Sequence, residues 1–236
     1  TTPTGSRSVK SNPGRVSDVL EFYAGAVSKI HGETIPTTRP GFDFTLREPV
    51  GVVGLIVPWH FPLYLASWKL GPALAAGNTV VLKPASWTPL TAVRFGELCL
   101  EAGLPAGVVN VVTGPGGSVG AALAAHPGVG KVGFTGETGT GQEIMRLAAG
   151  NLKKVSLELG GKSPNIVFAD ADIERFAAES PYSVFDNTGQ DCCARSRIIV
   201  HRSVHERVVE AFVAATGRMK VGDPADPATE VGPLVT

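Results

Sequence analysis

Two of the three cysteines of the chain are adjacent, at Cys192 and Cys193, in the segment Asn-Thr-Gly-Gln-Asp-Cys-Cys-Ala-Arg-Ser-Arg. This segment lies where a run with helical apolar spacing, 173–185, gives way to an apolar strand at 197–201. A thiol in such a turn can be partly exposed and lie near backbone N–H groups, which lower its pKa and make it a nucleophile. The alternative is that both thiols are small buried hydrophobes, as most cysteines are.

A carboxyl group with apolar neighbours, Glu158, lies at the end of another predicted strand, in Leu-Glu-Leu-Gly-Gly. A buried carboxylate without a cationic partner has its pKa raised towards neutrality, which suits a general base. The sequence therefore indicates a base at Glu158. A glutamate that caps a helix or forms an ion pair is the alternative.

A glycine turn offers a place for an anion. Gly136 follows a predicted strand at 131–135 and precedes a helix predicted from about 137 to 149. The first N–H groups of that helix and the positive end of its dipole can face a pyrophosphate. The Glu137 carboxylate would then have to point away from the anion, and the fingerprint G-x-G-x-x-G is not found. A purely structural turn is the alternative. Lys83, at the end of the predicted strand 79–82, is another candidate for a site residue, and a surface lysine is the alternative there.

The elements that position these residues alternate along the chain. Strands are predicted at 50–57, 79–82, 108–112, 131–135, 153–159, 165–168 and 197–201, with helical stretches such as 64–76 and 89–102 between them. Near-continuous apolar strands separated by helices are typical of an α/β fold with a parallel sheet covered on both faces. Such sheets bind ligands at the carboxyl ends of their strands, where Lys83, Gly136 and Glu158 fall.

The first fifty residues follow a different pattern. Residues 1–13 are rich in Thr, Ser, Gly and Pro and predict a loose end, whereas 16–30 carry apolar residues at helical spacing. Phe42, Phe44 and Leu46 alternate with polar residues, which predicts a half-exposed strand.

Composition and cysteine count indicate which partners and which cellular compartment to expect. The 236 residues are 43% hydrophobic, enough for a sizeable core, and 21 basic residues balance 21 acidic ones without a basic cluster, which argues against nucleic acid as a partner. An odd number of cysteines predicts free thiols in a reducing compartment. The apolar runs are too short to span a bilayer and the first residues do not have the order of a signal peptide, so we expect a soluble, cytoplasmic protein without a membrane partner.

The thiol segment contains Asn-x-Gly-Gln-x-Cys-x-Ala, which closely resembles the active-site stretch of the NAD(P)-dependent aldehyde dehydrogenase superfamily. Further motifs occur in the family's order and spacing: Pro58-Trp-His60-Phe-Pro62, Lys83-Pro-Ala-Ser86, Phe134-Thr-Gly136 and Glu158-Leu-Gly-Gly-Lys-Ser-Pro-Asn. The resemblance covers the chain from about Asp18 to its end and matches roughly the middle half of a full-length member. A truncated, catalytically silent relative that binds nucleotide or associates with full-length subunits is therefore an alternative to an active enzyme.

The resemblance implies how the chain is divided. Residues 1–34 and 50–159 would form a Rossmann-like parallel-sheet cofactor domain, 35–49 a bridging strand segment between subunits, and 160–236 the first part of an α/β catalytic domain. It also implies a homo-oligomer in full-length form, a small-molecule aldehyde as substrate, NAD or NADP as cofactor and no metal.

The resemblance also assigns roles. Cys192 would attack the aldehyde, His60 would help to hold the oxyanion, hydride would pass to the nicotinamide, and Glu158 would activate the water that releases the carboxylic acid from the thioester. The implied cofactor contacts are Val57, Pro58, Trp59, Lys83, Ser86, Thr135, Gly136, Glu137, Leu159 and Gly160. Lys69 matches another position near the cofactor, although a lysine that extends to water explains it nearly as well.

Several positions depart from the family. An asparagine amide in the family stands where this chain has His60, whose imidazole places its donor differently, so a packed neutral histidine is the alternative. Many NAD-preferring members have a glutamate where this chain has Ser86, and a serine can donate to a 2′-phosphate, so NADP stays open. Arg195 replaces a common glycine. Asp191 puts a negative charge beside the nucleophile, which favours aldehydes bearing an amine.

Overall fold

The computed structural model describes residues 6–235, with side chains from Gly14 onward. The chain forms two compact units, one of residues 12–158 and one of residues 159–235 together with 6–11.

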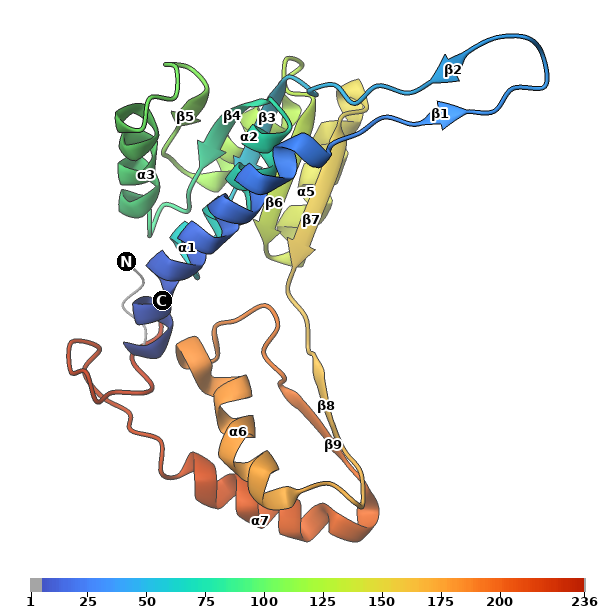
Figure 1. The fold of residues 1–236 in the computed structure, drawn as a ribbon. Helices are drawn as coiled ribbons and strands as arrows, with labels where there is room; N and C mark the ends of the chain where they lie inside the picture. Colours follow the sequence, from blue (N-terminus) through green and yellow to red (C-terminus); the bar gives the residue numbers. More distant parts are fainter. Residues whose placement is uncertain (1–5, 236) are drawn as a thin grey trace. The chain divides into compact units, whose positions relative to one another are not determined.

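The first unit is built on a sheet of five strands in the order β5-β4-β3-β6-β7 (Figure 1). The strands are β3 (Val52–Ile56), β4 (Thr79–Lys83), β5 (Val109–Val111), β6 (Lys131–Gly136) and β7 (Lys154–Leu159). β3 pairs in parallel with β4, with Val53 opposite Val80, and on its other side with β6, with Val53 opposite Lys131. The predicted α/β class with a parallel sheet is therefore confirmed.

Helices α2 (Pro62–Ala75), α3 (Leu90–Glu101), α4 (Ala121–Ala125) and α5 (Thr138–Ala148) lie between the strands of this sheet. Helix α1 (Ser6–Ala26) precedes all the strands, and its residues from 12 onward belong to this unit. A short π-helical turn, η2 (Gly116–Gly120), leads into α4. Helix α2 begins at Pro62, two residues before the predicted start, because proline has no N–H to leave unpaired at the first helical position. Phe61 in front of it has a left-handed backbone with φ of 45°.

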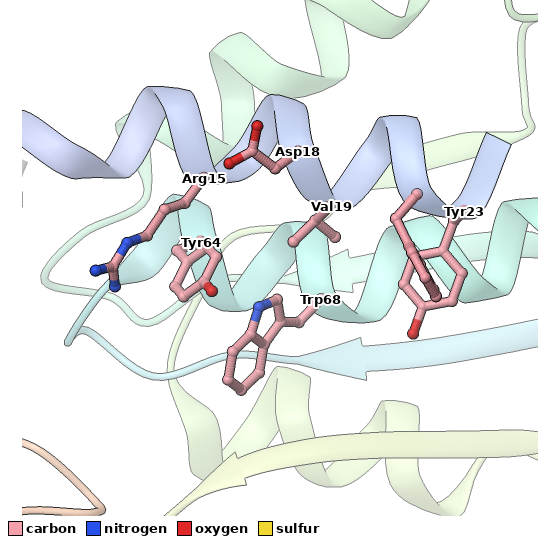
Figure 2. Close-up of a pocket in the computed structure, with 7 residues that line it drawn as sticks. Arg15, Asp18, Val19, Tyr23, Tyr64 and Trp68 are labelled. Atoms are coloured by element: carbon pink, nitrogen blue, oxygen red, sulfur yellow. The ribbon is translucent and has the colours of Figure 1, made fainter. Parts of the chain in front are cut away.

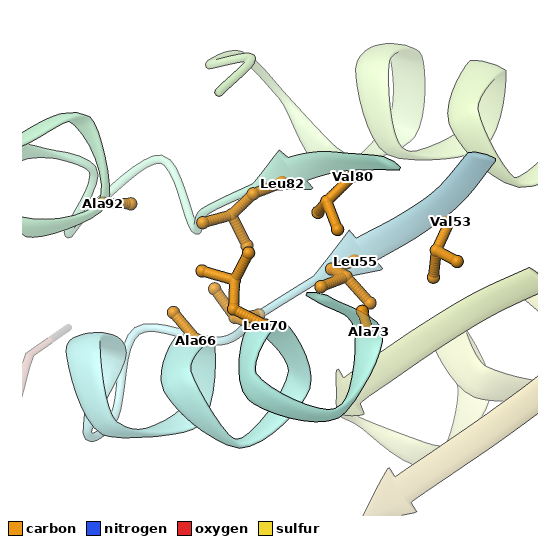
Figure 3. Close-up of a cluster of buried hydrophobic side chains, with 9 residues drawn as sticks. Val53, Leu55, Ala66, Leu70, Ala73, Val80, Leu82 and Ala92 are labelled. Carbon is orange, nitrogen blue, oxygen red and sulfur yellow. The ribbon is translucent and has the colours of Figure 1, made fainter. Parts of the chain in front are cut away.

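The core of the first unit lies between α2 and the central strands (Figure 3). Ala66, Leu70 and Ala73 are spaced at i, i+4 and i+7, so they share one face of α2. Figure 3 shows this face turned towards Leu55 and Leu82 on β3 and β4. Because β3 and β4 carry buried side chains in near-continuous runs, they are recognisable in the sequence as interior strands.

For the start of the chain, one prediction is wrong and a second holds only in part. Helix α1 begins at Ser6, so the predicted loose end is helical from there to Pro13, while residues 1–5 lie outside the described part. Residues 6–13 carry no apolar period in the sequence, so the pattern predicts only the later part of α1.

The segment around Phe42, Phe44 and Leu46 contains the predicted strand, but the strand is short and its side chains are not half-buried. The strands β1 (Thr34–Ile35) and β2 (Asp43–Phe44) form a short antiparallel hairpin that extends away from the sheet (Figure 1). All three side chains are largely exposed, at 77%, 49% and 70%. Alternation indicates the strand but not its burial, because neither face of the hairpin packs on a sheet or helix.

The second unit contains two parallel strands, β8 (Pro164–Val167) and β9 (Arg197–Val200), and two helices, α6 (Ile173–Phe185) and α7 (His205–Thr216). Val167, Ile173, Val204 and Val208 form its buried core. Helix α7 is not among the predicted elements, although Val208, Phe212 and Ala215 repeat at helical spacing. No helix in the described part of the chain is both long and apolar enough to cross a membrane.

Candidate active site

A cavity of about 770 Å³ lies at the carboxyl ends of β3, β4 and β6 in the first unit. Ligand sites typically measure about 300–1,000 Å³, and parallel sheets bind ligands at this edge. The predicted cofactor contacts of this unit all line the cavity, namely Val57, Pro58, Trp59, Lys83, Ser86, Thr135, Gly136 and Glu137. Leu159 and Gly160 belong to the other unit.

Lys83 lies in a cavity wall rather than on the open surface. Its exposed fraction is only 4%, and burial lowers the pKa of its ammonium group. Lys69 also points inward, because its Nζ donates a hydrogen bond of 2.6 Å to Oγ1 of the buried Thr135 at the end of β6. The interpretation of Lys69 as a lysine that extends to water therefore does not hold.

The N-terminus of α5 is already occupied by a carboxylate. Glu137 Oε1 accepts from the N–H of Gly139 at 2.8 Å and Oε2 from the N–H of Thr140 at 2.9 Å, and these bonds lower the pKa of Glu137. Glu137 therefore does not point away from the helix end, as a phosphate contact there would require. A phosphate at these N–H groups would have to displace the side chain.

Gly136 is needed for packing. A Cβ at this position would lie 2.5 Å from Cζ of Phe134, closer than any real contact. The glycine is thus explained by the adjacent ring, whether or not an anion binds beside it.

A glycine pair that is not among the predicted contacts also lines the cavity. Gly116 and Gly117 in η2 line the cavity, and a Cβ built on either would meet no atom within 4 Å. A ligand can therefore approach their backbone closely. The signal was the cluster Gly-Pro-Gly-Gly at 114–117, which follows a predicted strand.

Ser86 lies in the cavity wall with its hydroxyl engaged. Its Oγ donates a hydrogen bond of 3.1 Å to the carbonyl oxygen of Gly114. The hydroxyl would have to leave the Gly114 carbonyl in order to donate to a 2′-phosphate, so the carbonyl and the phosphate would compete for this donor.

His60 follows the cavity-lining Trp59 and is half-buried between two aromatic neighbours. Its ring centroid lies 5.5 Å from that of Trp59 and 5.9 Å from that of Phe61, both edge-on. The left-handed backbone of Phe61 and the proline that follows fix the turn that carries the imidazole.

Glu158 is not the buried carboxylate that the sequence predicts. Strand β7 is an edge strand whose side chains alternate between exposed and half-buried, and Glu158 is on the exposed side together with Lys154 and Ser156. Apolar neighbours in the sequence do not bury a side chain at an edge, because alternate residues of a strand face opposite ways. The base hypothesis for Glu158 therefore loses the support of burial in this structure.

The thiols of the second unit follow a tight turn. Asn187, Thr188 and Gly189 have left-handed backbones, with φ of 52°, 62° and 71°. The buried Asn187 holds the turn, since its Nδ2 donates to the carbonyl of Gln190 at 2.9 Å and its own carbonyl accepts from Gln190 Nε2 at 3.2 Å. The Asn-x-Gly-Gln motif thus shapes the loop that presents Cys192.

Asp191 controls the charge around both thiols. Its Oδ1 lies 3.6 Å from Cys192 Sγ and 3.2 Å from Cys193 Sγ, and it accepts from the Cys193 N–H at 3.1 Å. The pKa of Cys192 is raised, mainly by burial and next by the charge of Asp191. The pKa of Cys193 is raised to about 11, mainly by burial and next by the hydrogen bond to Asp191 and the charge of that carboxylate. The local environment therefore opposes thiolate formation, contrary to the activation expected from the turn.

A second hollow, of about 460 Å³, lies between α1 and α2 and contains none of the predicted site residues (Figure 2). Tyr23, Tyr64 and Trp68 supply aromatic walls, and the Arg15 guanidinium carbon lies 5.9 Å from the centre of the Tyr64 ring. Figure 2 shows the Asp18 carboxylate turned away from this guanidinium.

Comparison with known proteins identifies the class. The model of the aldehyde dehydrogenase family matches residues 6–236. Retinal dehydrogenase 2 of Gallus gallus is 52% identical over 221 residues, which are 93% of this chain and 43% of that protein. Cytosolic 10-formyltetrahydrofolate dehydrogenase of Xenopus tropicalis is 47% identical over 230 residues, 95% of this chain and 26% of that protein.

Solved structures agree with these relatives. The NAD⁺ complex of an aldehyde dehydrogenase from Bacillus cereus superposes with a TM-score of 0.95 at 46% identity, covering 99% of this chain and 48% of that one. A putative aldehyde dehydrogenase from Burkholderia cenocepacia gives a TM-score of 0.92 at 48% identity, covering 95% and 46%. The chain belongs to the aldehyde dehydrogenase family. It spans less than half the length of these relatives.

Proposed function

We propose that this chain is part of an enzyme that oxidises an aldehyde to a carboxylic acid with NAD or NADP. The observation that carries the proposal is the cavity at the carboxyl ends of β3, β4 and β6, because the predicted cofactor contacts of the first unit gather there. Family membership and the similarity to an NAD⁺ complex support the same activity.

The residues present fit a dinucleotide at most points of this cavity. Lys83 supplies a buried cation, and Gly116 and Gly117 leave their backbone open to a close ligand. A bound nicotinamide would supply the hydride acceptor for the oxidation. The Glu137 carboxylate is the one element that opposes an anion at the start of α5, so the phosphates would be held mainly by the other walls.

Cys192 is the proposed nucleophile. Its thiolate forms a bond to the aldehyde carbon, and the carbonyl π electrons become an oxyanion that the backbone N–H of Cys192 and the imidazole of His60 would stabilise. Loss of hydride from that carbon leaves a thioester on the sulfur. Water deprotonated by Glu158 then attacks the thioester, which releases the acid and regenerates the thiolate.

The proposal also includes a cellular compartment and an oligomeric state. Cys99, Cys192 and Cys193 are all free thiols, as a reducing, cytoplasmic setting requires. The exposed Phe42 and Phe44 on the projecting hairpin favour an interface with another subunit, so we include a homo-oligomer.

Turnover of an aldehyde panel with NAD and NADP tests the proposal, with nucleotide binding measured on the same protein by calorimetry. We expect acid formation that is lost in Cys192→Ala and kept in Cys99→Ala, which is matched in residue type. Nucleotide binding without turnover of any aldehyde would instead favour the catalytically silent, nucleotide-binding alternative.

His60 is tested by a pair of variants. If its donor is poorly placed, His60→Asn should raise kcat about tenfold and His60→Ala should lower it only slightly. A roughly hundredfold loss in His60→Ala would show that the imidazole holds the oxyanion.

A further inference from the structure

Three consecutive side chains of the second unit, Asp191, Cys192 and Cys193, point their polar atoms at one another. One carboxylate oxygen and the two sulfur atoms all lie within 4.8 Å of one another. Oδ1 of Asp191 is the common neighbour, at 3.6 Å from Cys192 Sγ and 3.2 Å from Cys193 Sγ. The left-handed turn before them and the bond from the Cys193 N–H to Asp191 hold this arrangement.

The spacing suits a tetrahedral metal ion. Zinc binds cysteine sulfur at about 2.3 Å and carboxylate oxygen at about 2.0–2.2 Å, and the tetrahedral angle then separates sulfur from oxygen by about 3.6 Å. The observed separations of 3.6 and 3.2 Å are close to this value, so only small side-chain movements are needed.

The donor set selects the kind of cation. Two thiolates and a carboxylate suit soft or borderline ions such as Zn²⁺ and Cd²⁺, whereas Mg²⁺ and Ca²⁺ prefer oxygen ligands alone. The two thiolates and the carboxylate would repel one another without a cation between them, and a divalent ion removes this repulsion. Cys193 is exposed and Cys192 half-buried in the second unit, which leaves a fourth coordination position for water.

We propose that Asp191, Cys192 and Cys193 bind one thiophilic divalent cation, and that this cation reversibly blocks the thiol of Cys192. Binding replaces the S–H bonds of both cysteines with metal–sulfur bonds and releases two protons for each ion, with no change of oxidation state. A metal-bound sulfur no longer offers its electron pair to a carbonyl carbon. The block of catalysis rests on the proposed function, whereas the metal site itself does not.

Titration of the protein with Cd²⁺ tests the site directly, because cadmium–thiolate bonds absorb in the ultraviolet. We expect one ion per chain, with protons released to an indicator dye, and no response to Mg²⁺. Cys193→Ser and Asp191→Asn should each weaken binding by about tenfold or more, since even outer partners of a metal site contribute about 10–100-fold. Cys99→Ser, which alters a buried thiol in the other unit, is the matched control.

Both test variants are conservative. Cys193 is exposed, and asparagine at 191 keeps an oxygen for the Cys193 N–H, so circular dichroism should show folded protein. Unchanged Cd²⁺ affinity in both variants, or a signal that Cys99→Ser abolishes, would overturn the site.

Activity is the second readout. Zn²⁺ should protect Cys192 from iodoacetamide and inhibit turnover, and Cys193→Ser should be inhibited only at about tenfold or higher zinc concentrations. If Zn²⁺ binds and protects Cys192 while turnover continues, the metal site stands and the assignment of Cys192 as nucleophile fails.

Discussion

Replacing Asp191 with asparagine should make Cys192 easier to ionise. Asp191 Oδ1 lies 3.6 Å from Cys192 Sγ, and its charge is one of the causes that raise the pKa of this thiol. Because the pair is partly exposed, we use the dielectric constant of water, at which two charges at this separation repel by about 1.2 kcal/mol. Removing the charge should therefore increase the ionisation constant roughly sevenfold.

The gain in reactivity is smaller than the gain in thiolate. A thiolate becomes less nucleophilic as its pKa falls, with a Brønsted slope of about 0.4–0.5. At a pH below the thiol pKa, Asp191→Asn should therefore be alkylated only about threefold faster than the parent protein. At a pH above the pKa of both forms, the same slope should make Asp191→Asn about twofold slower than the parent protein. The two rate profiles should therefore cross.

Iodoacetamide alkylation of Cys192, followed by peptide mass spectrometry from pH 6 to pH 11, measures both profiles. Asparagine keeps a hydrogen-bond acceptor for the Cys193 N–H, so the loop should retain its turn. Asp170→Asn, which changes an exposed aspartate in the turn before α6, is the control and should leave the profile unchanged. Equal rates for Asp191→Asn and the parent at every pH would refute the electrostatic argument.

Three further predictions follow from the first unit. Ser86→Glu should weaken NADP binding about tenfold and leave NAD binding nearly unchanged, because a carboxylate repels the 2′-phosphate; an equal loss in calorimetric titrations of both would contradict this. Leu70→Ala should cost about 2–5 kcal/mol of unfolding free energy in urea, because Leu70 is fully buried between α2 and the strands, whereas exposed Leu98→Ala should cost far less. The folded protein lowers the pKa of Glu137, so its carboxylate stabilises the fold above the unfolded pKa of about 4.3, and this stabilisation is lost as pH falls through the folded pKa. The difference in Tm between the parent protein and Glu137→Ala should therefore shrink in this acidic range. A difference that stays constant with pH would contradict the role of Glu137 as a helix cap.

The strands of the first unit could be predicted because buried strands have near-continuous apolar runs in the sequence. Val80 and Leu82 are fully buried in an almost uninterrupted apolar run, and such runs followed by Lys83 and Gly136 mark the ligand-binding edge. The parallel order of the strands places Lys83 and Gly136 at one cavity, whereas the other cofactor contacts that line it were named by the family resemblance.

The errors occur where burial depends on partners that the sequence does not name. Glu158 has apolar neighbours, yet it faces outward from an edge strand. Phe42 and Phe44 alternate like strand residues, yet their hairpin packs on nothing in its unit. The carboxylate of Glu137 illustrates a further limit, because composition does not show whether an acid near a helix start repels an anion or caps the helix itself.

The most direct test of the central claim is to trap the thioester. The enzyme that contains this chain is mixed with an aldehyde and NAD or NADP, quenched in acid and analysed by peptide mass spectrometry. We predict an acyl group on Cys192 that requires the cofactor and accumulates in Glu158→Gln. Reduced cofactor formed without acylation of Cys192, or with the acyl group on Cys193, would contradict the account.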